Sequence, residues 1–464
     1  MKEFSIKKLF KSKITGNVII VVASIVLVYM IISLYFAKHF FFNIIINGVD
    51  VSLKPQSNAN DKIINYIKDY KLQLIERNGE IEEISAQDIE MSYNEKNSIY
   101  RAYQNNNSFK WIISLVKKQE YYIEDLFTYN KDILENKIGE LACLNKDIIE
   151  PKNASFSYSS GSYEVVEEVY GNKVNKENLI KAIEESILKG EAKLDLNQSS
   201  CYENPKYTMN SDKTIEAREL LNKYIKTKIT YIFGTQTETL DENTINQWLN
   251  VNESLEVVVD EKEAFEYVLG LSKKYDTVGR GRNLKTSTGK TLEVKGGFYG
   301  WKIDCSAETK ELLQNIKNGD TLEKEPIYTQ KAITRGENDI GNTYVEINIT
   351  RQHLWFYKNG KLITQGSVVT GNPNRGNSTK LGIYMLNYKE KGSTLRGHDY
   401  EAEVTYWMPF NGNIGIHDAS WRYSFGGQIY KNNGTHGCVN APIYLAKTIY
   451  ENIEPGTPVI CYEE

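Results

Sequence analysis

The segment that most restricts how this chain can fold lies near its N-terminus, where a long stretch carries no charge. No Asp, Glu, Lys or Arg occurs from Ile14 to Ala37. As a helix, this stretch reaches roughly 36 Å, and the hydrocarbon core of a membrane is about 30 Å thick. The sequence therefore predicts a single transmembrane helix over residues 14–37.

The residues on either side of this stretch predict its orientation. Five lysines precede it: Lys2, Lys7, Lys8, Lys11 and Lys13. Because lysines beside a membrane span favour the cytoplasm, residues 1–13 are predicted as a cytoplasmic tail and the remainder as lying outside. A cleaved signal peptide is the alternative, but its apolar core is usually shorter and followed by small residues. Here the stretch exits through Tyr35, Phe36, Lys38 and His39, which favours an uncleaved signal anchor.

Length, charge and cysteine content limit the number of domains and the kinds of partner that we expect. The chain has 464 residues, a formal net charge of −4 and five cysteines. This length predicts two to four domains, and the small net charge gives no reason to expect nucleic acid as a partner. Because no Cys or His pairs show zinc-site spacing, we predict no metal and no cofactor. Four cysteines are interpreted as buried small hydrophobes, and an odd cysteine in an exported protein is a candidate reactive thiol.

Residues 46–330 contain what we interpret as an internal repeat. The segment from Tyr170 to Asn175 is echoed from Tyr299 to Asp304. Each segment is followed by a helix-like stretch, a glycine turn, a strand and a Pro-x-Tyr-Thr sequence, and each is preceded by a strand, a turn and a strand. This order predicts two divergent copies of one α+β module, at residues 46–210 and 211–330. Coincidence between two sheet-rich segments is the alternative.

Smaller features of the repeats lead to three further expectations. Ser306 is the candidate cap of the second helix. A group of basic residues near the second copy's glycine-rich turn is interpreted as a solvated face, with binding of an anionic polymer as the alternative; its members are Arg280, Arg282, Lys285 and Lys290. The polar, turn-rich residues 331–342 are predicted to form a linker.

Residues 343–464 have the pattern of an all-β domain. Val345 to Ile349 alternates in polarity, and a Lys-Asn-Gly-Lys turn after Tyr357 predicts a hairpin. Further strands are expected at 382–386 and 404–408, and one helix at 441–451. The expected fold is a compact β sandwich or half-open barrel with one short helix.

A histidine-cysteine constellation lies in the last 50 residues. The segment Thr435-His436-Gly437-Cys438-Val439-Asn440 follows His417-Asp418. An imidazole beside a thiol can make the thiolate available for attack on a carbonyl, and the N–H groups of Gly437 and Cys438 could hold an oxyanion. If thiolate and imidazolium form an ion pair, alkylation of Cys438 should stay fast below the free-thiol pKa of about 8.5. A buried structural turn is the alternative for His-Gly-Cys alone.

These residues carry a family resemblance over about 120 residues. His417 and the segment Thr435 to Asn440 resemble the signature of the L,D-transpeptidases of the YkuD family, and 407–410 and 416–422 resemble its clostridial type. The repeats resemble peptidoglycan-binding modules found upstream of YkuD domains. The resemblance implies a role in peptidoglycan biosynthesis and cell shape, and the predicted signal anchor would hold the chain at the membrane with its catalytic domain facing the cell wall.

The resemblance also implies roles for single residues. Cys438 would attack the carbonyl before the terminal D-Ala of a tetrapeptide stem, and His417 would be the base, oriented by a main-chain carbonyl near Asp418. His436 would steady the thiolate. The remaining pocket residues are Gly437, Asn440, Thr435, Asp418, Trp421 and Arg422. A diaminopimelate amine would then resolve the acyl-enzyme into a 3→3 cross-link, and carbapenems would acylate the cysteine.

Other functions and one departure from the family pattern remain open. Water as acceptor would make the chain an L,D-carboxypeptidase, and a non-catalytic wall-binding protein is a further alternative. The sequence does not support a sortase, because neither the Thr-Leu-x-Thr strand nor the arginine of a sortase occurs near Cys438. It does not support a zinc hydrolase, because further zinc ligands at suitable spacing are missing.

Where the family often has Thr-Pro-x-Gly, this chain has Thr379-Lys380-Leu381-Gly382. His398 is either part of a lid or an ordinary loop histidine.

Overall fold

The computed structural model describes residues 13–94, 99, 107–336, 338–397 and 401–464. It divides into two compact units, residues 1–155 with 165–214 and residues 156–164 with 215–464. The expected cytoplasmic tail up to residue 12 and the candidate lid residue His398 lie outside the described residues.

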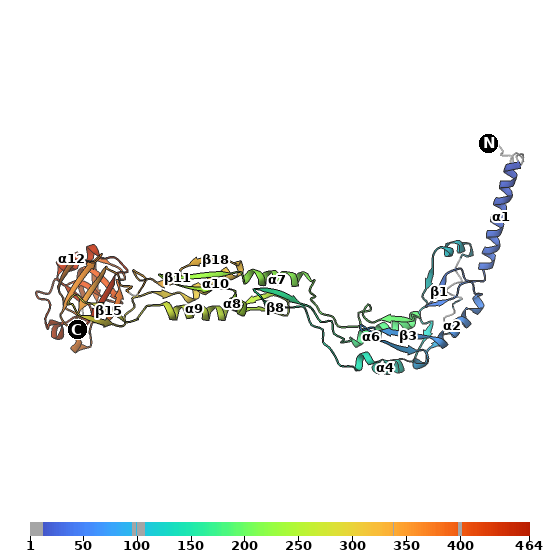
Figure 1. Ribbon diagram of the computed structural model, residues 1–464, viewed down its shortest axis with the longest axis horizontal. Helices are drawn as coiled ribbons and strands as arrows, with labels where there is room; N and C mark the ends of the chain where they lie inside the picture. Colours follow the sequence, from blue (N-terminus) through green and yellow to red (C-terminus); the bar gives the residue numbers. More distant parts are fainter. Residues whose placement is uncertain (1–12, 95–98, 100–106, 337, 398–400) are drawn as a thin grey trace. The chain divides into compact units, whose positions relative to one another are not determined.

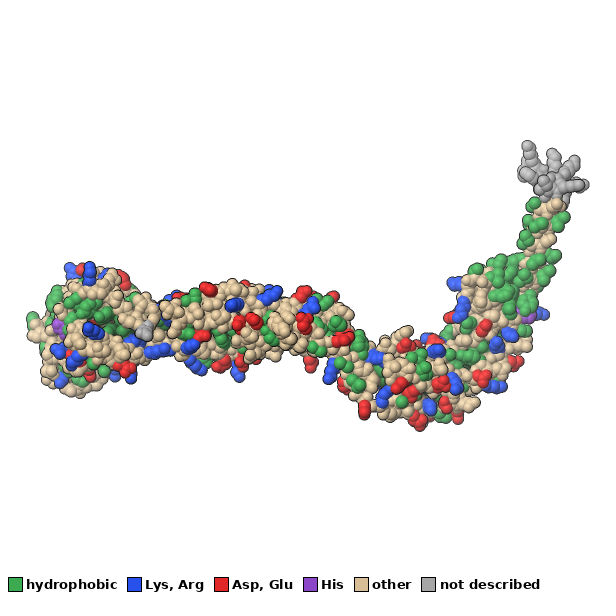
Figure 2. Space-filling model, in the orientation of Figure 1, with side chains coloured by type: hydrophobic (Ala, Val, Ile, Leu, Met, Phe, Trp, Pro, Cys, Tyr) green, Lys and Arg blue, Asp and Glu red, His purple; other side chains and the backbone are tan. Residues whose placement is uncertain are grey.

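The first unit begins with α1 (Lys13–Phe36), which lies where the sequence predicts a membrane helix (Figure 1). Its part from Gly16 to Phe36 is long and apolar enough to cross a membrane, with a mean hydropathy of 2.8. Most of its apolar side chains face outward, as the hydrophobic colour along the helix in Figure 2 shows. Near its C-terminal end, Ser33 and Phe36 are buried.

Module 1, the repeat copy in the first unit, is built on a three-stranded sheet with the order β10-β3-β4. β3 (Lys71–Ile75) and β4 (Ile81–Ser85) form an antiparallel hairpin, and β10 (Lys193–Asp195) runs parallel to β3. The helix α6 (Lys176–Lys189) precedes β10, and its apolar face is buried in the module's core.

Module 2, in the second unit, repeats this topology with the order β12-β11-β18. β11 (Lys228–Phe233) and β12 (Gln236–Leu240) form the hairpin, and β18 (Thr321–Lys324) runs parallel to β11 after the helix α10 (Cys305–Asn318). The shared strand order and directions confirm that the chain carries two copies of one α+β module.

The ends of the two equivalent helices also correspond. Asn175 caps α6 by accepting a hydrogen bond from the Asn178 N–H, and Asp304 caps α10 by accepting one from the Ala307 N–H. The cap of α10 is therefore Asp304 and not the expected Ser306, which already lies inside the helix. Both helices end at a glycine in the left-handed conformation, with φ of 68° and 75°.

The other elements complete the two modules (Figure 1). The first unit also contains β1 (Ile44–Ile46), β2 (Val49–Asp50), α2 (Ala59–Asp69), β5 (Ser92–Tyr93), η4 (Ser108–Leu115), β6 (Gln119–Tyr121), β7 (Phe127–Thr128), α4 (Lys131–Gly139) and α5 (Ala142–Asn145). Around and after the junction with the second unit lie β8 (Ser155–Ser159), β9 (Ser162–Val166), α7 (Asp212–Tyr224), α8 (Glu242–Ile245), β13 (Leu249–Val251), β14 (Val257–Val259), α9 (Glu261–Tyr275), β15 (Arg282–Lys285), β16 (Thr291–Val294), β17 (Lys302–Ile303) and β19 (Tyr328–Gln330).

The expected basic face differs from what the structure contains, and part of the expected linker is packed. Arg282, on β15, is buried, and its guanidinium donates to both carboxylate oxygens of Asp339 at 2.8 Å. The interpretation of Arg282 as part of a solvated face is therefore wrong, because Asp339 compensates its buried charge. Ala332 and Ile340 lie in a core with residues of both module 2 and the C-terminal domain, so the segment 331–342 is packed and not solvent-exposed throughout.

The C-terminal domain is a two-sheet sandwich, which confirms the expected mainly-β fold. One sheet has the order β22-β21-β20-β28-β23 and the other β24-β25-β26-β27, and one core joins them. The strands are β20 (Tyr344–Asn348), β21 (His353–Lys358), β22 (Lys361–Ser367), β23 (Gly382–Met385), β24 (Glu390–Arg396), β25 (Glu401–Asn411), β26 (Ile414–Asp418), β27 (Val439–Ala441) and β28 (Pro458–Tyr462). The expected helix is α12 (Ile443–Asn452), and a short second helix, α11 (Ile429–Asn433), was not expected.

Candidate active site

The segment that carries the cysteine is held by main-chain pairing and by one threonine. It connects α11 to β27, and Thr435 exchanges main-chain hydrogen bonds of 3.0 Å with Thr370 and Asn372. The Thr435 hydroxyl donates to the Cys438 carbonyl at 2.6 Å and accepts from the Gly437 N–H at 3.0 Å. The Gly437 N–H is therefore already engaged, which leaves the Cys438 N–H as the better of the two expected oxyanion donors.

A second threonine reaches the same segment from a distant loop. The buried Thr379 hydroxyl donates to the Gly437 carbonyl at 2.7 Å and accepts from the Gly371 N–H at 3.0 Å. Thr379 begins the segment that departs from the family pattern, so the residue that contacts the cysteine segment is present although the proline is not. Sequence reasoning missed this contact, because nothing local indicates a partner so far along the chain.

Cys438 lies in an apolar environment. It is 8% exposed and packs in a small cluster with Val404 and Trp407. Its sulfur donates to the Asn413 carbonyl at 3.5 Å. Burial raises the pKa of the thiol to about 11, although a hydrogen bond from the Gly415 N–H acts in the opposite direction.

His417, on β26, is buried between two tryptophans. Its ring centre lies 5.9 Å from that of Trp407 and 6.0 Å from that of Trp421. Its Nδ1 lies 2.9 Å from the Asp418 carbonyl oxygen, the kind of contact that the family resemblance implies. A carbonyl can only accept, so Nδ1 carries the proton and Nε2 of the neutral ring is free to accept one. Desolvation lowers the pKa of His417, which favours this neutral form.

The environments of the two groups argue against a preformed ion pair. Burial shifts the pKa of Cys438 upward and the pKa of His417 downward, and each shift disfavours the charged form. Both pKa shifts therefore oppose the thiolate–imidazolium pair that the sequence-based hypothesis assumes.

Most of the expected site residues line one pocket of about 490 Å³. Among them are Cys438, His417, His436, Thr435, Asn440, Trp421 and Arg422. Two expected residues are not part of the lining. They are Gly437 and Asp418, whose carboxylate accepts hydrogen bonds from the Thr405 and Tyr406 N–H groups. The main-chain carbonyl of Asp418 therefore orients His417, while the Asp418 carboxylate links β26 to β25 by hydrogen bonds.

Two polar groups in the pocket stand out because they lack protein partners. Asn440 Oδ1 is buried and has no hydrogen-bond partner among the described residues. The same holds for Arg422 Nε, although another nitrogen of that guanidinium donates to the Asn433 carbonyl at 2.8 Å. Burial lowers the pKa of Arg422, and no described carboxylate forms an ion pair with it. Both atoms are themselves inaccessible to solvent, so a ligand contacts them only if the side chains around them move.

The hairpin of β24 and β25 supplies one wall of the pocket, which sequence reasoning also missed. Leu395, Glu401, Ala402 and Glu403 line the pocket from these strands. The alternation of apolar and polar residues in β25 indicates a strand. The sequence of β24 is polar and is typical of a loop.

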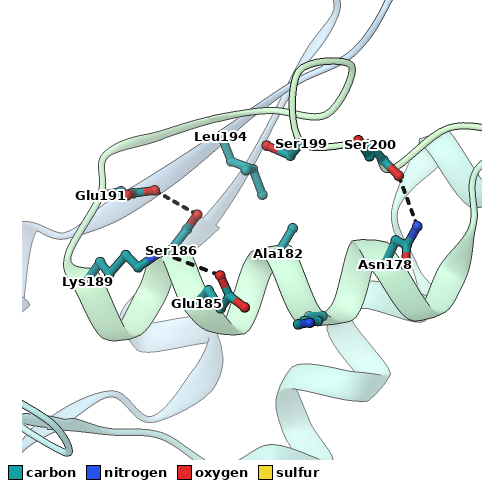
Figure 3. Close-up of a pocket in the computed structure, with 10 residues that line it drawn as sticks. Asn178, Ala182, Glu185, Ser186, Lys189, Glu191, Leu194, Ser199 and Ser200 are labelled. Carbon is teal, nitrogen blue, oxygen red and sulfur yellow. Dashed lines mark hydrogen bonds and ion pairs between the residues drawn. The ribbon is translucent and has the colours of Figure 1, made fainter.

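Module 1 contains a pocket of its own, of about 510 Å³, along α6 (Figure 3). Several of its polar side chains are bonded to each other or to the main chain. Ser186 donates to Glu191, Lys189 pairs with Glu185, and Asn178 donates to the Ser200 carbonyl. No Cys or His lines it, so it offers no nucleophile for the chemistry expected at Cys438.

Comparison with known proteins places this geometry in a family. Residues 342–461 match the YkuD family, an L,D-transpeptidase catalytic domain. Residues 82–195 and 207–323 match the family described as "Putative peptidoglycan binding domain". Among solved structures, the Ldtfm–avibactam carbamoyl enzyme is 32% identical over 54% of this chain and 99% of that one, with a TM-score of 0.45. The chain belongs to the L,D-transpeptidases.

Two further L,D-transpeptidase structures resemble the chain. A cysteine-to-serine mutant of L,D-transpeptidase from Enterococcus faecium is 31% identical over 54% of this chain and all of that one, with a TM-score of 0.44. The catalytic domain of L,D-transpeptidase from E. faecium, acylated by ertapenem, is 38% identical over 26% of this chain and 98% of that one, with a TM-score of 0.25. No protein of curated function matches this L,D-transpeptidase.

Proposed function

We propose that this L,D-transpeptidase forms 3→3 peptidoglycan cross-links through a thioester on Cys438. The observation that carries the proposal is the convergence of Cys438 and His417 on one pocket, with Nδ1 of His417 committed to the Asp418 carbonyl. The other ring nitrogen is then available to take the thiol proton. His436 lines the same pocket.

The reaction begins from the neutral pair. As a tetrapeptide stem binds, Nε2 of His417 takes the thiol proton and the sulfur attacks the carbonyl that precedes D-Ala. The imidazolium then returns the proton to the departing amine, which releases D-Ala and leaves the acyl group on sulfur. The side-chain amine of diaminopimelate on a second stem attacks the thioester, His417 takes a proton from that amine, and the thiol is regenerated. The Cys438 N–H is positioned to hold the oxyanion in both steps.

The unpartnered polar groups of the pocket supply substrate contacts. The half-buried Arg422 suits a substrate carboxylate, because guanidinium and carboxylate match in geometry and charge. Asn440 Oδ1 is buried without a partner among the described residues, and it accepts a stem-peptide N–H once substrate binding moves the side chains that cover it. Glu401 and Glu403 also line the pocket, and their negative charge suits the ammonium group of the acceptor.

The remaining segments are proposed to bring this site to its substrate. The two modules bind peptidoglycan, as their family match supports. α1 acts as an uncleaved, single-pass signal anchor, which leaves residues 1–13 in the cytoplasm and the catalytic domain facing the cell wall. Failure of residues 46–330 to sediment with purified sacculi would remove the binding role of the modules.

The central test uses full-length protein in detergent with disaccharide-tetrapeptides as the substrate. Mass spectrometry should detect 3→3 linked dimers and free D-Ala. Cys438→Ala should abolish both products. Cys305→Ala makes the same chemical change at a partly exposed cysteine on α10 and should leave both intact. Dimers formed by Cys438→Ala would disprove the cysteine mechanism.

The same experiment separates the alternatives. D-Ala released together with monomeric tripeptide and no dimer would identify an L,D-carboxypeptidase. No product from the intact protein, together with binding to sacculi, would identify a wall-binding protein. Acylation by a carbapenem, suggested by the ertapenem-bound relative, should add the drug's mass to the intact protein and not to Cys438→Ala.

A further inference from the structure

The segment η4 presents apolar side chains outward next to α1. Five residues in and directly after η4 are about half exposed or more, which is unusual for large apolar side chains in a row. They are Phe109, Ile112, Ile113, Leu115 and Val116, with exposed fractions between 47% and 90%. Figure 2 shows hydrophobic side chains gathered along α1 and where it meets the rest of module 1.

The other side of η4 is fixed to α1. The Trp111 indole donates to the Ser33 hydroxyl at 3.2 Å, and its ring lies 5.9 Å from that of Phe36. Further up the helix, the Tyr29 hydroxyl donates to the Phe109 carbonyl. η4 is also held at its end, because Asn43 donates to the Ser114 carbonyl and β6 pairs with β1.

These contacts place η4 at a defined depth along the candidate membrane span. Tyr29 lies seven residues before the end of α1, or about 10 Å along the helix axis. If the membrane ended before Tyr29, residues 16–28 alone would remain inside it. That stretch reaches roughly 20 Å, well short of the roughly 30 Å hydrocarbon core. A membrane that accommodates α1 therefore also reaches the Phe109 end of η4, beside Tyr29, while the Ser114 end lies beside Asn43, past the end of α1.

We propose that residues 108–116 lie in the outer leaflet and bind lipid acyl chains, so that module 1 contacts the membrane at a second segment besides α1. The proposal rests on the proposed role of α1 as an anchor. The charges near η4 agree with it. Lys110, inside the segment, is exposed and long enough to carry its ammonium group to the headgroups. Lys117 follows directly and is exposed, where it meets anionic headgroups, whereas the ammonium group of Lys118 pairs with Glu120 at 2.6 Å.

Photo-cross-linking in full-length protein tests the proposal. The photoreactive analogue benzoylphenylalanine replaces one residue at a time, and the protein is reconstituted into vesicles of phosphatidylglycerol and phosphatidylcholine. Ile112 and Val116 are the test positions. Leu27, exposed on α1, is the positive control, and Ile148, an exposed isoleucine after α5, is the matched negative control. Irradiation should give lipid adducts at Ile112, Val116 and Leu27, and many fewer at Ile148.

Each other outcome overturns a specific statement. Lipid adducts at Leu27 without adducts at Ile112 or Val116 would disprove the second contact and leave the anchor intact. Protein–protein adducts at Ile112 in place of lipid adducts would show that η4 binds another chain. No lipid adduct at Leu27 would disprove the anchor and with it this inference, while transpeptidase activity would remain a separate result.

Discussion

At the scale of single residues, the two reacting groups of the pocket share an apolar environment. Trp407 lies against both Cys438 and His417, and the low polarity around them opposes charge on sulfur and on the ring. Such a thiol is protected from adventitious electrophiles in water. The family chemistry then depends on proton transfer within the bound complex.

The alkylation rate of Cys438 should follow this raised pKa. Because the reactive thiolate becomes abundant only as pH approaches about 11, the rate should be low at pH 7 and rise about tenfold per pH unit above it. Iodoacetamide labelling followed by mass spectrometry of the Cys438 peptide measures the rate. His417→Asn should leave alkylation at pH 7 nearly unchanged while abolishing transpeptidation. A rate that stays constant between pH 6 and 8 would instead indicate an ion pair.

The Asn440 side chain should contribute to the reaction with substrate and not to the stability of the fold. Asn440→Leu removes a buried acceptor that has no partner among the described residues, so the thermal midpoint should not fall. The value of kcat/KM should fall by up to about tenfold, the equivalent of one hydrogen bond of roughly 1.4 kcal/mol. Asn348→Leu is the matched control, because that buried side chain contacts Tyr462 and Arg351 and its loss should lower the midpoint. Unchanged kcat/KM in Asn440→Leu would exclude the proposed contact.

Sequence reasoning could find the residues that react but not those that hold them. Cys438, His417 and Asn440 belong to a spaced signature, and the structure places all three in one pocket. Thr379, Asn413 and Gly415 reach the cysteine segment through single contacts. Such contacts leave no periodicity or spacing in the sequence, because they depend on how distant loops pack.

At the scale of elements, the active site depends on two loops joined by Thr379. Its hydroxyl connects the loop before β23 to the segment before β27. The strands themselves were predictable from alternation, as in β20 and β21. The polar β24 and the short α11 were not, because their sequences lack an apolar period.

Thr379→Val should therefore impair both stability and catalysis. The substitution keeps the shape but leaves the Gly437 carbonyl and the Gly371 N–H without their hydroxyl partner, at about 1–3 kcal/mol for each buried group. The unfolding midpoint and kcat should both fall, measured by thermal denaturation and by dimer formation. Thr379→Ser restores the hydroxyl and should recover most of both. If Ser and Val variants behave alike, the hydrogen bonds are not what Thr379 contributes.

The buried ion pair of β15 makes a similar prediction for module 2. Arg282→Met leaves Asp339 as an uncompensated buried charge, which typically costs roughly 3–5 kcal/mol. Arg280 is exposed and lies two residues before Arg282. Arg280→Met should change the free energy of unfolding by less than about 0.5 kcal/mol. Urea denaturation of both variants gives the comparison. Equal midpoints would show that Asp339 does not depend on Arg282.

At the scale of the whole molecule, module 2 and the catalytic domain within the second unit share one core. Ile383, Ile460 and Tyr462 of the catalytic domain pack with Leu284, Val294 and Trp301 of module 2. The turn between β15 and β16 also binds the catalytic domain, since Ser287 donates to Glu346 at 2.9 and 2.6 Å. The repeat itself was predictable from sequence order, but this packing between domains was not.

Residues 343–464 alone should be less stable than residues 211–464. Separating them exposes the apolar face around Ile383, Ile460 and Tyr462 and leaves the buried Glu346 without Ser287. Calorimetry should show a lower midpoint for the catalytic domain in the shorter fragment. In the longer fragment, Ser287→Ala should lower the midpoint of the same domain, while Ser306→Ala, at an exposed serine of module 2, should not. Equal midpoints for the two fragments would mean that the shared core adds no stability.

The shared core also determines how a bound polymer reaches Cys438. When a flexible tether joins a binding module to an enzyme, the effective concentration of substrate depends on tether length and many distances are sampled. Here Ala332, Asp339 and Ile340, in the described part of the segment 331–342, are packed against module 2 and the catalytic domain, so this segment does not act as such a tether. If module 2 holds a glycan strand, only some stem peptides would reach the pocket. They would be those at one distance from module 2 along the strand and at one rotation about the strand axis. The arrangement would select cross-linking positions by geometry along the strand.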